Sequence, residues 1–249
     1  MQKSCINYYE EGNKVMKAIL ISVRPQWAEL ILNLIKKDEI RKGTAIGKAI
    51  NKLIEEQGVA PMLMYCTKDK KYTLERNTDE PYDFFTLKDK KHLVFKLNKN
   101  HCGYNGKVLA RFNATVEHIE YETCSRDISG WWKDDGKMYD HKDACLTYKE
   151  MFDYVGGGEG SVIHIDNLKV FDKPKELREF KTPIMAERYK RDLEKAYEDD
   201  CEISARLAEG IANDDECANC VELTEMSEGY YGLARAPESY CYIEIEEAK

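Results

Sequence analysis

The stretch from residue 17 to residue 42 constrains the fold most, because it predicts a strand, a helix and a second strand in direct succession. Residues 17–23 (KAILISV) are aliphatic and β-branched, which predicts a buried strand. Pro25 suits the first turn of a helix, where its missing N–H would have no partner in any case. The apolar residues that follow repeat at the spacing of one helix face, and they are Trp27, Leu30, Ile31, Leu34 and Ile35.

A polar site is expected where this helix meets the second strand. If residues 37–42 (KDEIRK) are extended, Glu39 and Arg41 lie on one face of the strand, and the helix end brings Lys36 beside them. The two cations and the carboxylate could hold a base or a phosphate, with Trp27 either packed in the core or stacked on the base. They could also catalyse a reaction, with Glu39 as general base and Lys36 stabilising an oxyanion. A ladder of surface ion pairs is the structural alternative.

The rest of the chain predicts several strands and few long helices. Helices are expected at residues 44–57 and 146–154, and a long charged helix at residues 184–210. We expect a loop around Trp131 and Trp132, and strands at residues 61–67, 92–97, 108–121, 161–171 and 240–245. The total of about six strands favours an α+β fold, a mixed β-barrel with helical insertions, over a doubly wound sheet.

Composition limits where the protein works and what it binds. No run of about 18 apolar residues is present and the first residues lack the apolar core of a signal peptide, so we expect a cytoplasmic protein with no membrane partner. The net charge is −8 and no broad basic face is evident. Any nucleic acid bound would therefore be short, single-stranded or held in a local cleft.

The nine cysteines predict reduced thiols or a metal site, because disulfides rarely persist in the cytoplasm. Cys217 and Cys220 form a CxxC pair that could supply half of a tetrahedral zinc site, with Cys201 and Cys241 as candidates for the other half. The alternative is an acidic helix and loop without metal. No other cofactor is expected.

The stretch RPQWAELILNLIKKDEIRK (residues 24–42) resembles the signature of ASCH domains, members of the PUA-like barrel superfamily, in which a Gly-x-Lys-x-x-Glu-x-Arg run follows the first helix. Lys36, Glu39 and Arg41 fall on that run, and Leu34 stands at its glycine. Residues 63–68, 164–177 and 235–245 are also similar to phage-associated members. The resemblance implies a single ASCH-type, PUA-like domain over residues 1–249, with mostly helical insertions at residues 44–57 and 185–230.

The resemblance also implies a small cleft that binds RNA or a modified nucleoside. Arg235 and Ser239 lie in its Arg-x-Pro-x-Ser-Tyr stretch, and the last strand of a barrel usually lies near the first, so we expect both residues near Lys36. RNA or nucleotide binding is the leading expectation, with these ligand-binding residues: Trp27, Lys36, Glu39, Arg41, Arg235 and Ser239.

Two other functions stay open. Some members of the family are ribonucleases or hydrolyse an acylated cytidine, the latter with a Lys, a Thr and a Glu, and Glu39 stands here at the position of that Thr. A hydrolase on the same cleft would use Lys36 and Glu39 as catalytic residues. The third possibility is a protein-interaction module that docks a partner through the acidic helical insertion at residues 185–230.

Overall fold

The computed structural model describes residues 15–77, 84–89, 103–125, 128–183 and 239–246, together with residues 233 and 237. Within this part, three α-helices accompany a mixed β-sheet, so the expected α+β class is confirmed. The strand expected at residues 92–97, the helix expected at residues 184–210 and the insertion at residues 185–230 lie outside the described residues.

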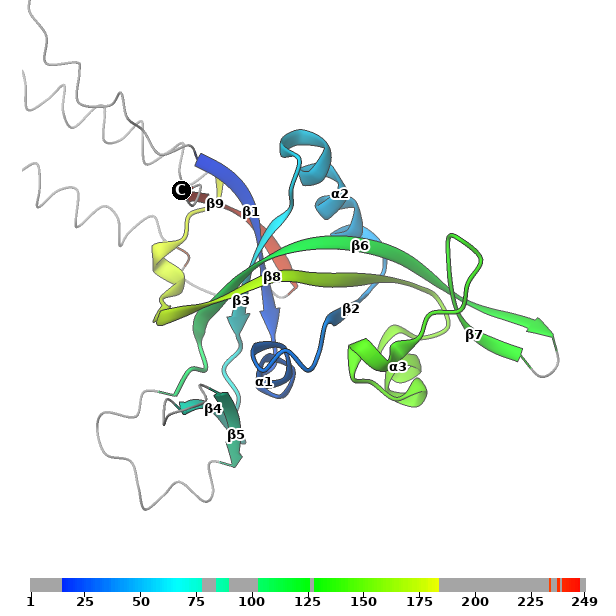
Figure 1. Ribbon diagram of the computed structural model, residues 1–249, viewed down its shortest axis with the longest axis horizontal. Coiled ribbons are helices and arrows are strands. Elements are labelled where there is room, and N and C mark those ends of the chain that lie inside the picture. The colour runs from blue at the N-terminus through cyan, green and yellow to red at the C-terminus, as the bar shows by residue number, and fades with distance from the viewer. Residues whose placement is uncertain are drawn as a thin grey trace, which may run out of the picture.

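The main sheet has seven strands, and Figure 1 shows how the helices are arranged around it. Its order is β2 (Asp38–Lys42), β8 (Glu159–Lys175), β6 (Lys107–Ser125), β3 (Pro61–Cys66), β1 (Val15–Val23) and β9 (Tyr240–Glu246), with β7 (Ile128–Lys133) paired to β6. β1 and β3 are parallel, whereas the other pairs are antiparallel. The end strands β2 and β9 do not pair with each other, so the described strands do not form the expected closed barrel.

The first strand is buried on both faces, which explains its almost continuous apolar sequence. Ile19 and Ile21 pack in the largest core cluster with residues of α1 (Pro25–Leu32) and α2 (Ala45–Gln57). Leu20 packs on the other face with Phe180 and with residues of β9. α2 is the helix expected at residues 44–57.

The first helix is shorter than its apolar spacing predicts. It ends at Leu32, and Leu34 and Ile35 are 67% and 57% exposed instead of continuing the buried stripe. The helix cannot continue because Leu34 has φ +60°, and the side-chain amide of Asn33 donates to the Phe85 carbonyl and accepts from the Phe85 N–H, both at 2.8 Å. These bonds join the end of α1 to β5 (Phe84–Asp89), which forms a separate two-stranded sheet with β4 (Tyr72–Asn77).

The segment around the two tryptophans is a strand, not the expected loop. β7 pairs with the far end of β6, and β6 and β8 run side by side toward it (Figure 1). Strand alternation places Trp131 in a second core cluster with Met151 of α3 (Tyr148–Val155), whereas Trp132 points to the opposite face. The sequence reading was wrong here because charged residues on both sides of the pair resemble a loop.

A search of the helices in the described residues found none with the length and apolar character that a bilayer crossing requires.

Candidate functional site

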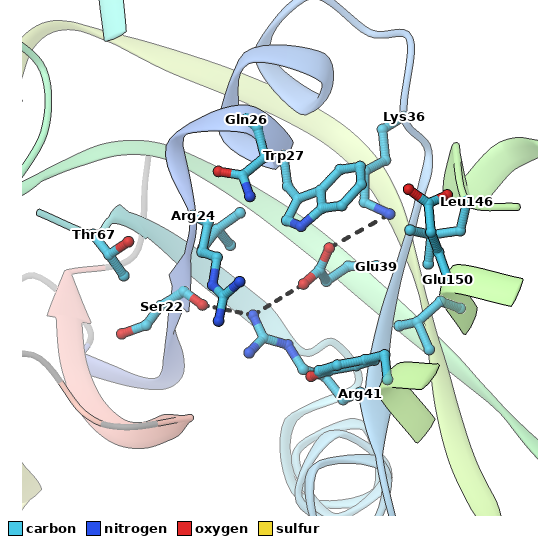
Figure 2. A pocket seen from close by; sticks show the side chains of 13 residues that line it. Ser22, Arg24, Gln26, Trp27, Lys36, Glu39, Arg41, Thr67, Leu146 and Glu150 are labelled. Carbon is cyan, nitrogen blue, oxygen red and sulfur yellow. Dashed lines mark hydrogen bonds and ion pairs between the residues drawn. The ribbon is translucent and has the colours of Figure 1, made fainter. Parts of the chain in front are cut away.

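A cavity of about 470 Å³ lies at the β2 edge of the main sheet, a size typical of small-molecule sites. Its walls come from the end of β1, the first turn of α1, the strand β2 and the helix α3. Figure 2 shows its lining side chains, among them all three residues of the expected polar site.

Glu39 lies between the two cations of this site. Its Oε1 is 3.1 Å from Nη2 of Arg41, and its Oε2 is 3.6 Å from Nζ of Lys36 (Figure 2). The Lys36, Glu39 and Arg41 residues are only 2%, 7% and 9% exposed, so a ladder of surface ion pairs is excluded. Strand alternation explains why residues 39 and 41 meet, as the sequence predicted.

Backbone carbonyls hold the two cations in place. The Lys36 ammonium donates to the Ala144 carbonyl at 2.5 Å, and Nη2 of Arg41 donates to the Ser22 carbonyl at 2.7 Å. Burial lowers the pKa of Lys36, although the Glu39 carboxylate acts in the opposite direction. The cavity therefore contains an ammonium group that loses its proton more readily than a lysine in water.

Trp27 contributes to both the cavity and the core. Its half-buried side chain packs against the main core cluster and also lines the cavity, with Nζ of Lys36 5.4 Å from the ring centroid. In Figure 2 the indole lies beside Glu39 and Lys36. The two alternatives for Trp27, core packing and contact with a ligand, are thus compatible.

The cavity also has polar groups that no described residue satisfies. The Nε atom of Arg41 is buried and has no hydrogen-bond partner among the described residues. Arg24 lines the cavity, but its exposed side chain makes neither a helix-capping bond nor an ion pair with any described residue. A ligand with an acceptor group could satisfy both.

Ser239 and Arg235 were both expected near Lys36, and only Ser239 is among the described residues. The Ser239 carbonyl accepts from the N–H of Ser22, a residue that lines the cavity, but the exposed Ser239 side chain is not itself part of the lining. The last strand does lie beside the first, because β9 pairs with β1. Arg235 lies outside the described residues.

The proposed zinc ligands are described only at Cys241. This residue is half-buried in β9, where burial raises the pKa of its thiol. Cys201, Cys217 and Cys220 lie outside the described residues. Within the described part of the chain, no cluster of three or more metal-binding side chains is found.

The sequence reading missed the wall that α3 contributes. Glu150 and Tyr154 of α3 line the cavity, together with Leu146 just before the helix, and the two helical residues are four apart, which is the spacing of one helix face. This periodic signal was available, but nothing in the sequence placed that face over β2. Glu150 has a second task, because its carboxylate accepts from the Thr147 N–H at 2.8 Å in a capping box.

The opposite face of β2 carries a second buried polar group. Asp38 accepts from the Tyr139 hydroxyl at 2.7 Å and bonds to Nδ1 of His164 at 2.8 Å. Burial of the Asp38 carboxyl acts to raise its pKa, but the bonds from His164 and Tyr139 outweigh that and keep the pKa below its usual value. The bond to Asp38 in turn raises the pKa of His164. These contacts fasten β2 to its neighbours and thereby position Glu39 and Arg41.

No protein-family profile matches this sequence, and comparison with curated proteins also found no match. The function is therefore inferred from the cavity and from the sequence resemblance.

Proposed function

We propose that this protein binds a nucleotide or a short RNA in the cavity at the edge of β2. One observation carries the proposal: a buried carboxylate held between two cations lies beside an indole, inside a cavity large enough for a nucleotide. The site combines a flat apolar surface with both donors and acceptors, which a nucleobase requires.

Each side chain has a role that follows from its chemistry. Trp27 stacks on the base, an interaction that does not depend on which base is bound. Glu39 accepts from an exocyclic amine, because each carboxylate oxygen can accept a further hydrogen bond in addition to the cation beside it. Arg41 and Lys36 donate to carbonyl, hydroxyl or phosphate oxygens of the ligand.

We further propose that the fold is a PUA-like variant whose described strands form an open sheet, and that the cavity corresponds to the ASCH-type cleft. The convergence of Lys36, Glu39 and Arg41 in one cavity supports this, because these residues match the family pattern. Leu34 gives independent support: it stands at the glycine of the pattern and has φ +60°, a conformation that glycine adopts without strain.

A hydrolytic activity in the same cavity is the second candidate. The lowered pKa of Lys36 favours it, since such shifts are common where acid–base chemistry occurs. Against it, both oxygens of Glu39 already form ion pairs, with Lys36 and with Arg41, and this arrangement is explained by binding alone. Turnover of RNA or of an acylated nucleoside that disappears in Glu39→Gln would establish this candidate, and binding without turnover would exclude it for the compounds tested.

Thermal shift and calorimetry with nucleosides, nucleotides and short RNAs would test the binding proposal. We expect a ligand that raises the Tm of the wild type and binds Lys36→Ala at least about tenfold more weakly, because a hydrogen bond to a charged group contributes about 1.5–3 kcal/mol. Lys37→Ala is the matched control, since Lys37 is exposed and does not line the cavity.

Lys36 is buried, so Lys36→Ala could unfold for reasons unrelated to a ligand. Trp27→Leu therefore serves as a second variant that keeps an apolar side chain against the core but removes the stacking surface. If no nucleoside, nucleotide or RNA binds the wild type, the proposal is wrong.

A further inference from the structure

Arg24 supplies an uncommitted positive charge at the entrance of the cavity. It is the N-cap residue of α1, and its guanidinium group has no ion-pair partner among the described residues. Figure 2 shows the Arg24 and Arg41 side chains directed into the same part of the cavity, on the Ser22 side of Glu39. Among the described residues, the Glu39 carboxylate pairs with Arg41 and is already shared with Lys36, whereas Arg24 has no such partner.

Arg41 adds a donor that the described residues leave unsatisfied. Its Nη2 atom is occupied by the Ser22 carbonyl and by Glu39, but its buried Nε has no partner among the described residues. A buried donor without an acceptor costs about 1–3 kcal/mol, so such groups normally have a partner. Because Arg41 lines the cavity and is only 9% exposed, an acceptor group of a ligand bound there is one candidate partner for this donor.

The first turn of α1 faces the same region. Arg24, Gln26 and Trp27 all line the cavity, and the Arg24 side chain does not cap the helix. A helix N-terminus carries a partial positive charge and attracts anions, above all phosphate. The helix end, the Arg41 guanidinium and the Arg24 guanidinium, which has no ion-pair partner among the described residues, thus all favour an anion in this part of the cavity.

We propose that this end of the cavity is a phosphate subsite, so that the ligand is a phosphorylated nucleoside and not a free nucleoside or base. The inference rests on the proposed nucleotide-binding function and specifies its ligand. The phosphate lies between Arg24 and Arg41 at the start of α1, and the base lies against Trp27 and Glu39. Arginine suits this role because its planar group forms paired hydrogen bonds to phosphate oxygens.

Calorimetry with the four ribonucleosides, their 5′-monophosphates and inorganic phosphate tests this subsite. For the preferred base, the wild type should bind the monophosphate about 10-fold to 100-fold more tightly than the nucleoside, as expected for one or two charge-assisted bonds. Arg24→Gln should reduce that ratio to below about threefold. Because the side chain of Arg24 is exposed, we expect this variant to fold as the wild type does.

Arg178→Gln is the matched control, because it removes the same charge from an exposed residue outside the cavity and should leave the ratio unchanged. Arg41→Lys keeps the charge but lacks Nε, and it should lower the ratio as Arg24→Gln does.

The outcomes separate the two proposals. Equal affinity of the wild type for nucleoside and monophosphate would overturn the subsite and leave the proposed function standing. Binding of inorganic phosphate that depends on Arg24, with no contribution from any nucleoside, would support the subsite and overturn the nucleotide function. No binding of any probe would overturn both.

Discussion

Leu34 holds the turn between α1 and β2 in a backbone conformation that costs free energy in an L-residue. Its φ of +60° lies in the left-handed region, and its side chain is 67% exposed, so little packing compensates for the strain. The next residues along the chain are Ile35 and Lys36, which means that this turn determines how Lys36 enters the cavity.

We predict that Leu34→Gly stabilises the protein by about 1 kcal/mol, because the left-handed conformation costs an L-residue about 1–2 kcal/mol and glycine loses part of that gain through its greater freedom when unfolded. Urea unfolding measures the difference. Ile35→Gly is the control: it is similarly exposed but has no positive φ, so it should be destabilising. A similar loss of stability in both variants would contradict the strain at Leu34.

At the residue level, the sequence could predict the polar site but not which of its donors would lack a hydrogen-bond partner. Strand alternation alone places Glu39 beside Arg41, and the helix end delivers Lys36. The unsatisfied Nε of Arg41 could not be predicted, because it depends on which carbonyl reaches the guanidinium group. That carbonyl belongs to Ser22, a residue nineteen positions earlier in the chain.

The edge strand β2 is the element on which the site depends, and side chains as well as its backbone hold it in place. It pairs only with β8 among the described strands. On the face away from the cavity, the Asp38 carboxylate joins it to Tyr139 and to His164.

The contribution of this clamp should depend on pH. Because the pKa of His164 is raised above its unfolded value of about 6.5, its stabilising effect is complete below about pH 6 and is lost as the pH rises through the folded pKa. We expect His164→Gln to cost about 1 kcal/mol near pH 5.5, the value of a charged hydrogen bond reduced by partial exposure, and less near pH 8.5.

Urea unfolding at both pH values measures this cost. Tyr139→Phe removes the other bond to Asp38. Because the pKa of Tyr139 is raised, the hydroxyl keeps its proton at both pH values, and the loss of stability in Tyr139→Phe should be the same at each. If His164→Gln lost more stability at pH 8.5 than at pH 5.5, the predicted direction of the pH dependence would be wrong.

The sequence predicts a helix or strand where local residue chemistry determines its conformation. It does not predict the features that tertiary contacts determine. Pro25 and the apolar spacing predict α1, but the helix ends at the left-handed Leu34, where Asn33 bonds to β5, and spacing alone cannot predict either feature. Likewise, α3 was expected, whereas its position over β2 was not. β7 was missed because pairing with β6, and not its own composition, makes it a strand.

The net charge of the whole molecule is unfavourable for a polyanion, although the cavity lining carries three cations against two carboxylates. The chain carries a net charge of −8, whereas Arg24, Lys36 and Arg41 line the cavity. A short RNA should therefore be held by few phosphate contacts, without long-range attraction from the rest of the surface.

We predict a weak dependence of RNA affinity on salt. One or two phosphate contacts give a slope of about −0.7 each in a plot of log affinity against log salt, so affinity should fall only about threefold to sevenfold between 50 and 200 mM salt. Fluorescence anisotropy with a labelled oligonucleotide measures this slope. A slope steeper than about −3 would indicate a broad basic surface and contradict a local site.

Ser22 links the cavity to a distant part of the chain. Its hydroxyl donates to the Pro237 carbonyl at 2.7 Å, 215 positions away, while its own carbonyl holds Arg41. During synthesis, a chain emerges from the ribosome N-terminus first, and early segments begin to fold before later ones exist. The cavity begins to form with β1, yet Ser22 is fixed only after residue 237 has been made. A nascent chain should therefore be unable to bind its ligand fully until residue 237 has been translated.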